Sequence, residues 1–305
     1  MTGLPEVGTR VSLRYRLPRG STPPHSDVVG HLLDTGPTVR IRTRRGDVVA
    51  VAAADVLAVR VVPEVPVRTG EIRNLEHAAA LGWPGTEHEW LDGWLLRFGH
   101  GATRRANSAV PLHFTSYAEI VAVADWYAAR GAVPLVSVPD RLLRLPDGVH
   151  TDAENLVMAA DMDALADVAD AHTGMHVASR PDAEWLRLYQ RDVPVDVLTA
   201  VVDGEVGFGR LDGAAVGRVA ITEAPDGTRW AGVSAVHVSG DARRRGLARA
   251  LCAGLIDWAE QRGAGRCYVQ VVTDNPGARA LYESMGFWVH HRSRYVRADE
   301  LLAQK

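Results

Sequence analysis

Three consecutive arginines and a glycine stand at the start of an apolar helical pattern in the last third of the chain. The segment combines cations with small and apolar residues: Arg243, Arg244, Arg245, Gly246, Leu247 and Ala248. Leu251, Leu255 and Trp258 continue from Leu247 at spacings of four, four and three residues, which predicts one face of a helix. Its first backbone N–H groups have no partner within the helix, and its dipole favours negative charge there. Residues 243–248 therefore predict a phosphate-type anion site, and the alternative is a solvated basic helix start.

A second strand, turn and helix follow some thirty residues later. Residues 268–272 are β-branched and aromatic, as in a strand, and Asn275-Pro276 is typical of a helix N-cap followed by proline at the first position. Ala278, Leu281, Tyr282 and Met285 recur at helical spacing, and Gly286 ends the pattern as a C-terminal cap. Tyr282 thus lies on a buried stripe, either as a core tyrosine or as a residue that faces a ligand.

These two segments together resemble the GCN5-related N-acetyltransferase (GNAT) superfamily. Residues 243–248 fit its phosphate loop (Arg or Gln, two residues, Gly, one residue, Gly or Ala), and Asn275, Leu281-Tyr282 and Gly286-Phe287 fit its later pattern. The resemblance implies an α/β fold of the α+β kind, in which helices flank a mixed central sheet. It also implies an N-acetyltransferase that transfers an acetyl group from acetyl-CoA to a primary amine by direct attack.

The resemblance assigns roles residue by residue. Val236 and Val238 would pair through their backbone with the pantetheine arm, and residues 243–248 would hold the pyrophosphate. Asn275 would contact acetyl-CoA, and the Tyr282 hydroxyl would protonate the departing thiolate as general acid.

The sequence does not identify which group acts as the general base. An attacking amine must lose a proton, and the expected strand from Trp230 to Val238 contains no Asp or Glu. His237 is the titratable side chain there, but it alternates to the face opposite Val236 and Val238. Glu205 and Glu223 on neighbouring hairpins, or a chain of water molecules, are the alternatives.

Residues 1–65 predict a separate small β-barrel that resembles an SH3-like barrel. Val11 and Leu13 alternate with polar residues, as do Val39 and Ile41, and further short strands are expected at 48–51 and 55–62. The arginines of the outward face are Arg14, Arg16, Arg40, Arg42, Arg44 and Arg45. Because residues 1–65 hold nine arginines against six acidic residues, we expect a solvated face and no nucleic-acid partner.

We expect two further domains, as in long actinobacterial members of the family: a degenerate GNAT-like, acceptor-side lobe at 68–190 and a GNAT acetyl-CoA-binding catalytic domain at 191–305. In the lobe, Arg104, Arg105, Asn107 and Ser108 follow a Trp-rich hairpin and are candidate lining residues of an acceptor pocket. Trp83, Trp90, Trp94 and Trp126 are expected in the core. The catalytic domain should begin with an antiparallel meander whose first strand spans 197–202.

Composition and residue pattern argue against several other classes of protein. The net charge is −3 with 47% hydrophobic residues, which gives no general attraction to nucleic acid or membranes. Cys252 and Cys267 fall in apolar patterns and are expected in the core, with neither a disulfide nor a metal. His290-His291 is not read as a metal pair, because neighbours on a strand point to opposite faces. We expect a cytoplasmic protein that acts on a small-molecule or peptide amine, as a monomer or a homodimer.

Two other functions remain open on the sequence alone. The missing base allows a catalytically silent module that binds acyl-CoA for regulation. The N-terminal barrel could instead direct an acetyltransferase to nucleic acid.

Overall fold

The computed structural model describes residues 4–18, 20–43, 46–61, 67–165 and 175–303. Its contacts divide the chain into two compact units, residues 1–66 and residues 67–305, and each unit is described by itself. The expected linker prolines Pro63 and Pro66 and the arginines Arg44 and Arg45 lie outside the described residues.

The N-terminal unit is a small antiparallel sheet with the strand order β4-β3-β2-β1-β5. Its strands are β1 (Arg10–Arg16), β2 (His25–Thr35), β3 (Thr38–Thr43), β4 (Val48–Ala52) and β5 (Val56–Val61). The alternating residues Val11, Leu13, Val39 and Ile41 are fully buried, as the period of two predicts.

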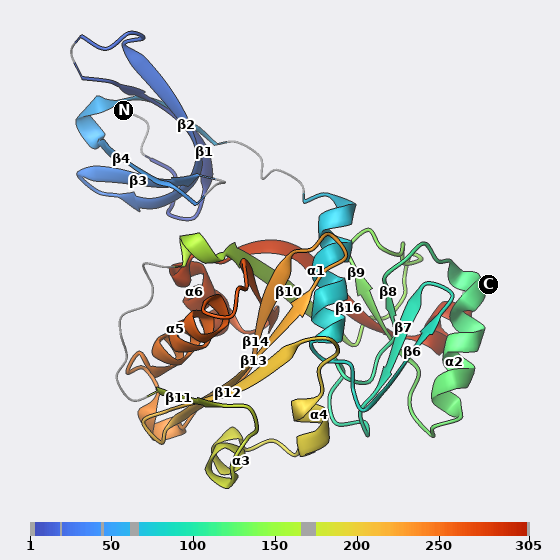
Figure 1. The fold of residues 1–305 in the computed structure, drawn as a ribbon. Coiled ribbons are helices and arrows are strands. Elements are labelled where there is room, and N and C mark those ends of the chain that lie inside the picture. The colour runs from blue at the N-terminus through green and yellow to red at the C-terminus, as the bar shows by residue number, and fades with distance from the viewer. Residues whose placement is uncertain (1–3, 19, 44–45, 62–66, 166–174, 304–305) are drawn as a thin grey trace. The chain divides into compact units, whose positions relative to one another are not determined.

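The expected barrel is not closed in this unit. The sheet curls (Figure 1), but β4 and β5 lie at its two edges and do not pair within the described residues. The expected outward arginines are in part neutralised, because Arg14 bonds Asp27 at 2.7 Å and Arg16 lies 4.0 Å from Asp55.

The second unit is built on an eight-stranded mixed sheet with the order β11-β12-β13-β14-β15-β10-β16-β9. Its strands are β9 (Leu135–Pro139), β10 (Ala153–Asp161), β11 (Met175–Ala178), β12 (Glu205–Leu211), β13 (Ala215–Glu223), β14 (Arg229–Val238), β15 (Arg266–Val272) and β16 (Trp288–Arg297). β14 and β15 run parallel, and the other strand pairs described in this sheet are antiparallel. The mixed sheet expected from the sequence is confirmed.

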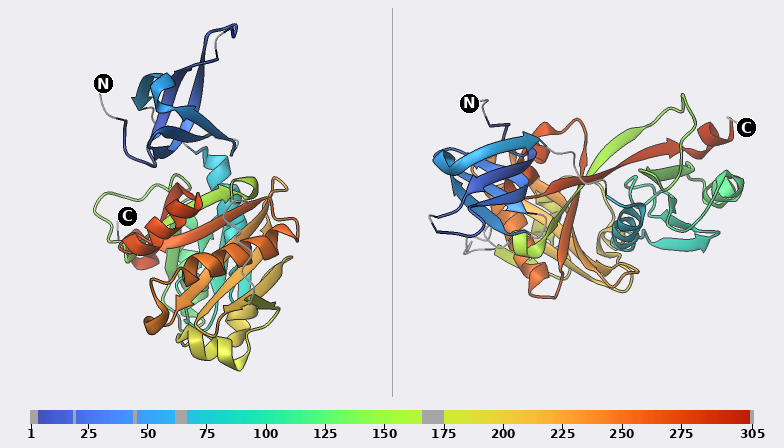
Figure 2. Two further views of the ribbon diagram at one scale, coloured as in Figure 1. Left: turned by 90° about the vertical axis from the view of Figure 1, so that its left-hand side faces the viewer. Right: turned by 90° about the horizontal axis from the view of Figure 1, so that it is seen from above.

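Helices cover both faces of this sheet (Figures 1 and 2). On one face, α5 (Leu247–Glu260) and α6 (Pro276–Met285) pack on the central strands in the largest apolar cluster. On the other face lie α1 (Thr69–Leu81), α3 (Ala183–Tyr189) and the short α4 (Val195–Thr199), around Trp83, Trp185 and Trp230.

A smaller antiparallel sheet and one helix complete the unit. This sheet contains β6 (Glu87–Leu91), β7 (Trp94–Phe98) and β8 (Val110–Pro111), and α2 (Ile120–Ala128) packs beside it with the C-terminal α7 (Ala298–Leu302). The strand β16 pairs with β10 on one side and with β9 on the other, so it links these elements to the central sheet. The division of this unit near residue 190 stays a prediction, and strands from both sides of that point share the large sheet.

Two local expectations are wrong. Residues 197–202 do not form a strand, because α4 takes the first half of this segment, with Val197 and Leu198 buried, and β11 pairs with β12. Trp90 is 43% exposed and stacks between His77 and His113, whereas Trp83 and Trp94 are buried as expected.

Candidate functional site

The two parallel strands separate at the middle of the sheet. β14 pairs with β15 only from Trp230 to Val233, opposite Arg266 to Val269, and then continues to Val238 paired only with β13 on its other side. A bulge coincides with this point, since Arg218 of β13 faces Ser234 while Val216 faces His237, which leaves one extra residue on β14. Ala235 in the bulge has a φ of 53°, a left-handed conformation. The chain therefore builds an opening between two parallel strands at the segment that the resemblance assigns to acetyl-CoA.

The side chains after the bulge divide between the two faces of the sheet. Val236 and Val238 pack against the apolar cluster under α5, while Ala235 packs in the cluster that contains Trp185. Burial, together with Arg243 and Arg191, lowers the pKa of His237. The His237 ring is therefore neutral near pH 7, which is the form that accepts a proton.

The arginine-rich loop leads into α5 with unusual backbone conformations. Arg244 has a φ of 61° and Gly246 a φ of 80°, and α5 begins at Leu247 as expected. Gly246 is the N-cap and offers no side chain to the first N–H groups of the helix. A Cβ at Gly246 would meet nothing within 4 Å, so the left-handed conformation, and not crowding, requires glycine there.

The arginines of this loop are exposed around the free helix end. Arg243 donates from Nε to the Val238 carbonyl at 3.3 Å, which ties the loop to the end of β14. Arg244 and Arg245 are exposed, and Leu247 and Ala248 are half-buried. The combination of free backbone N–H groups and exposed guanidinium groups fits a pyrophosphate.

Helix α6 has the N-cap that the sequence predicts. The Asn275 Oδ1 accepts a hydrogen bond from Ala278 N at 3.0 Å, and Pro276 occupies the first turn. The cap does not use the amide NH₂ group of Asn275, which remains a donor for a ligand. Gly286 ends the helix at a φ of 102°.

Tyr282 lies inside the α5–α6 cluster and is 7% exposed. Its hydroxyl lies beside the Cys252 thiol, and its ring contacts Phe287 at 5.6 Å. Burial, and secondarily Cys252, raises the pKa of Tyr282 well above its ordinary value. The hydroxyl is therefore protonated at neutral pH, as that of an ordinary tyrosine also is, and it holds its proton more tightly.

Glu205 and Glu223 lie away from the bulge. Glu205 pairs with Ile221 of β13, and Ile221 pairs with Ala231 of β14. Glu205 is therefore level with Ala231, which lies five residues before Val236, or about 16 Å along the strand. It is also paired with Arg229 and Arg262 at 3.7 and 3.5 Å. Glu223 is exposed and faces Arg229, further still from the bulge.

The four acceptor-pocket candidates fall into three groups: two buried residues with structural hydrogen bonds, one exposed arginine and one arginine that reaches inward. Asn107 holds its own loop, with hydrogen bonds from Gly99 N and Gly101 N to its Oδ1. Ser108 is buried and bonds the Arg97 guanidinium at 3.0 Å, and Arg104 is exposed. Arg105 alone reaches inward, since its guanidinium carbon lies 5.5 Å from the centre of the Trp83 ring.

Arg218 is a candidate residue that the sequence reading missed. It is fully buried on β13 and donates to the carbonyls of Leu198, Gly82 and Ala200 at 2.7–2.9 Å. Its guanidinium also lies 4.2 Å from the centre of the Trp83 ring, and burial lowers its pKa to about 9. An arginine within the apolar run Ala-Val-Gly-Arg-Val-Ala-Ile was the signal that could have found it.

His290 and His291 form a buried chain with Glu76 of α1. His290 Nδ1 lies 2.8 Å from His291 Nδ1, and His291 Nε2 lies 2.7 Å from Glu76 Oε1. The expectation that the two rings point to opposite faces is wrong, because β16 bulges at His290: Val157 faces His291 and Met158 faces Val289. Burial, and secondarily His291, lowers the pKa of His290 to about 2.

No group of His, Cys, Asp and Glu suited to a metal ion occurs within the described ranges. Within the same residues, no helix is long and apolar enough to cross a membrane. Cys252 and Cys267 are buried free thiols, as expected.

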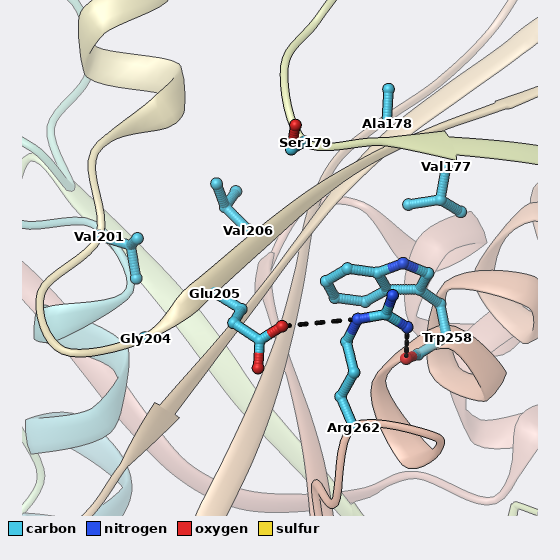
Figure 3. A pocket seen from close by; sticks show the side chains of 9 residues that line it. All are labelled: Val177, Ala178, Ser179, Val201, Gly204, Glu205, Val206, Trp258 and Arg262. Atoms are coloured by element: carbon cyan, nitrogen blue, oxygen red, sulfur yellow. Dashed lines mark hydrogen bonds and ion pairs between the residues drawn. The ribbon is translucent and has the colours of Figure 1, made fainter.

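A cavity of about 380 Å³ lies between β11, β12 and the end of α5. Figure 3 shows that Glu205, Arg262 and Trp258 form one wall, and Arg262 stacks on the indole at 4.0 Å. The cavity lies at the Glu205 end of β12, so it is remote from the bulge of β14.

The parallel strands that separate at a bulge, followed by an uncapped helix start with a basic loop, define an acyltransferase of the GNAT class. Residues 69–296 match the family described as "Probable histone acetyltransferase Rv0428c C-terminal", and residues 5–60 match "Rv0428c N-terminal Sm-like domain". The chain belongs to this Rv0428c family, and its small N-terminal sheet is the Sm-like domain.

Relatives and solved structures agree with this. The chain is 45% identical over 303 residues to the probable histone acetyltransferase Rv0428c of Mycobacterium tuberculosis, covering 99% of this chain and 98% of the relative. It is 22% identical to the uncharacterized N-acetyltransferase YobR of Bacillus subtilis, over 71% of this chain and 94% of YobR. A GCN5-related N-acetyltransferase from Kribbella flavida has the same fold, with a TM-score of 0.55 and 16% identity over 75% of this chain and 96% of that one.

Proposed function

We propose that this GNAT acetyltransferase transfers the acetyl group of acetyl-CoA to a primary amine by direct attack. The observation that carries the proposal is the coincidence of the β14 bulge at Ala235 with the separation of β14 from β15. This opening is followed at once by the uncapped, arginine-rich start of α5.

GNAT acetyltransferases use acetyl-CoA, and the residues present fit that molecule. The backbone of Val236 and Val238 would hold the pantetheine arm, and residues 243–248 would bind the pyrophosphate through N–H groups and guanidinium groups. Asn275 would donate its amide NH₂ to the same molecule. When bound, acetyl-CoA supplies an acetyl group that is activated as a thioester.

The chain's own groups then move the protons and stabilise charge. Backbone N–H groups of β14 near Val238 would donate to the acetyl oxygen as negative charge develops on it. Tyr282, which stays protonated at neutral pH, would donate its hydroxyl proton to the departing thiolate. His237 is retained as a candidate base because its ring is neutral, with a water chain as the alternative, and Glu205 and Glu223 are dropped because of their positions.

The printed name of one relative supports one class of acceptor over another. The relative from Mycobacterium tuberculosis is named a probable histone acetyltransferase, which favours an amine on a protein or peptide. A small-molecule amine remains an alternative.

The first experiment tests acetyl-CoA binding. Acetyl-CoA at about 100 times its Kd should stabilise the protein by about 2.7 kcal/mol, measured as a rise in Tm. An unchanged Tm would contradict the proposal.

The second experiment tests Tyr282 by CoA release and calorimetry. Tyr282→Phe should lower kcat by about 10²- to 10⁴-fold while the Kd for acetyl-CoA stays within about twofold. Tyr295→Phe, another buried tyrosine but on β16, is the matched control and should leave kcat nearly unchanged. Cofactor binding without CoA release from any amine or peptide would identify a silent binding module instead.

A further inference from the structure

Arg218 is a buried cation that has no acidic partner among the residues that the structure describes. Its Nε and Nη2 donate to three carbonyls, but its Nη1 is buried and has no hydrogen-bond partner within the described part of the chain. Burying a guanidinium donor without a partner costs free energy, so an unpaired Nη1 in the middle of a sheet needs an explanation.

Arg105 brings a second guanidinium to the same indole. Its Nε is also buried without a partner, yet the residue as a whole is partly exposed. The guanidinium carbons of Arg105 and Arg218 lie 5.5 and 4.2 Å from the centre of the Trp83 ring. Burial lowers the pKa of Arg218, and the charge of Arg105 lowers it further, so the two cations are within electrostatic range of each other.

This cluster lies beside the place where acetyl transfer would occur. Trp83 Nε1 donates to Ser234 Oγ at 3.3 Å, and Ser234 directly precedes the bulge residue Ala235. Arg218 also faces Ser234 across the β13–β14 pair. Two cations with unused donors therefore lie beside the bulge of β14, on the face of the sheet opposite α5.

We propose that Arg105 and Arg218 form a subsite for a carboxylate carried by the acceptor amine. Guanidinium N–H groups match carboxylate oxygens in geometry and charge, and Arg105 Nε and Arg218 Nη1 are donors that no described residue of the protein uses. The Trp83 ring, which both guanidinium groups approach, provides a flat apolar wall for the carbon chain that joins the carboxylate to the amine. The proposal rests on the proposed function, because it names the acceptor of the same reaction.

The subsite restricts the acceptor. An amine with a nearby carboxylate fits, such as a free amino acid or a peptide with an acidic residue beside the target amine. A target amine surrounded only by Lys and Arg does not fit, because two guanidinium groups repel it.

The test compares acceptors in pairs that differ only in charge. CoA release is measured with β-alanine and glutamate against their carboxamides, and with a peptide containing Glu-Lys against one containing Gln-Lys. The wild-type protein should favour the carboxylate member by about 10- to 100-fold in kcat/KM, the range expected for a charge-assisted hydrogen bond. Arg105→Gln should reduce this preference to within about twofold, Arg105→Lys should retain part of it, and neither should change the Kd for acetyl-CoA.

The control is Arg187→Gln on α3, a 67% exposed arginine, which should keep the full preference. Equal kcat/KM for carboxylate and carboxamide, with turnover of both, would overturn the subsite and leave the proposed function standing. A preference of more than tenfold for phosphoethanolamine over β-alanine would assign the site to phosphate and overturn the carboxylate.

The subsite is testable even without turnover. Calorimetry of glutamate with CoA present should then give weaker binding to Arg105→Gln than to the wild type by at least tenfold. Equal binding to the two proteins would overturn the inference by itself.

Discussion

The buried chain Glu76–His291–His290 makes the stability of the second unit depend on pH. Burial holds the pKa of His290 at about 2, whereas a histidine in the unfolded chain has a pKa of about 6.5. The folded-state pKa is depressed, so the unfolded chain binds a proton that the folded chain does not. Stability from this residue is fully present above about pH 6.5 and is lost as the pH falls.

The magnitude follows from these two values. Between pH 6 and pH 5, one such histidine lowers the free energy of unfolding by about 1.2 kcal/mol. In His290→Asn this part should disappear, because asparagine does not titrate. The variant should be less stable at pH 7, since His291 loses a hydrogen-bond partner, but its stability should fall less steeply with acid.

Urea unfolding followed by tryptophan fluorescence measures this directly. All eight tryptophans lie from Trp83 to Trp288, so the signal reports on the unit at 67–305. His88→Asn, which removes an exposed histidine, is the control. If the loss between pH 6 and pH 5 is the same in His290→Asn as in the wild type, the reasoning is refuted.

Three further predictions concern the loop, the buried arginine and the thiols. Gly246→Ala should lower the free energy of unfolding by about 1–2 kcal/mol, because alanine must adopt the φ of 80°, and should weaken acetyl-CoA binding in calorimetry. Gly240→Ala should do neither, because Gly240 has no positive φ and open space around its Cβ. Arg218→Met should lower the free energy of unfolding by about 3 kcal/mol or more in urea, because three carbonyls lose a charged donor; a loss below about 1 kcal/mol would contradict this. Cys252 and Cys267 should not react with a disulfide reagent at pH 8 until urea is added. Burial raises the pKa of Cys252 to about 12 and that of Cys267 further, so neither thiol forms the reactive thiolate in the folded protein. Rapid labelling of the folded protein would refute this prediction.

The sequence predicts those parts of the site that depend on local signals. The start of α5 at Leu247, the cap at Asn275 and the stop at Gly286 each follow from a residue type with one strong conformational preference. The alternation that buries Val11 and Leu13 is equally local.

Features that depend on strand pairing cannot be predicted from local sequence signals. The bulges at Ala235 and His290 arise from the register between neighbouring strands, and a simple period of two places His290 and His291 on opposite faces. The residues at 197–202 are rich in β-branched side chains, but β11 takes the edge of β12 at which they could have paired. Propensity predicts which residues suit a strand, and not which strands have a partner.

The position of β16 has a consequence for how the protein is made. This strand is translated after all the others described, and it fills the space between β10 and β9. A nascent chain that has reached Gly286 therefore carries β10 with one unpaired edge and Glu76 without His291. Exposed strand edges promote association between chains, so the interval before Trp288–Arg297 emerges from the ribosome is when this protein is most exposed to misassembly and to chaperones.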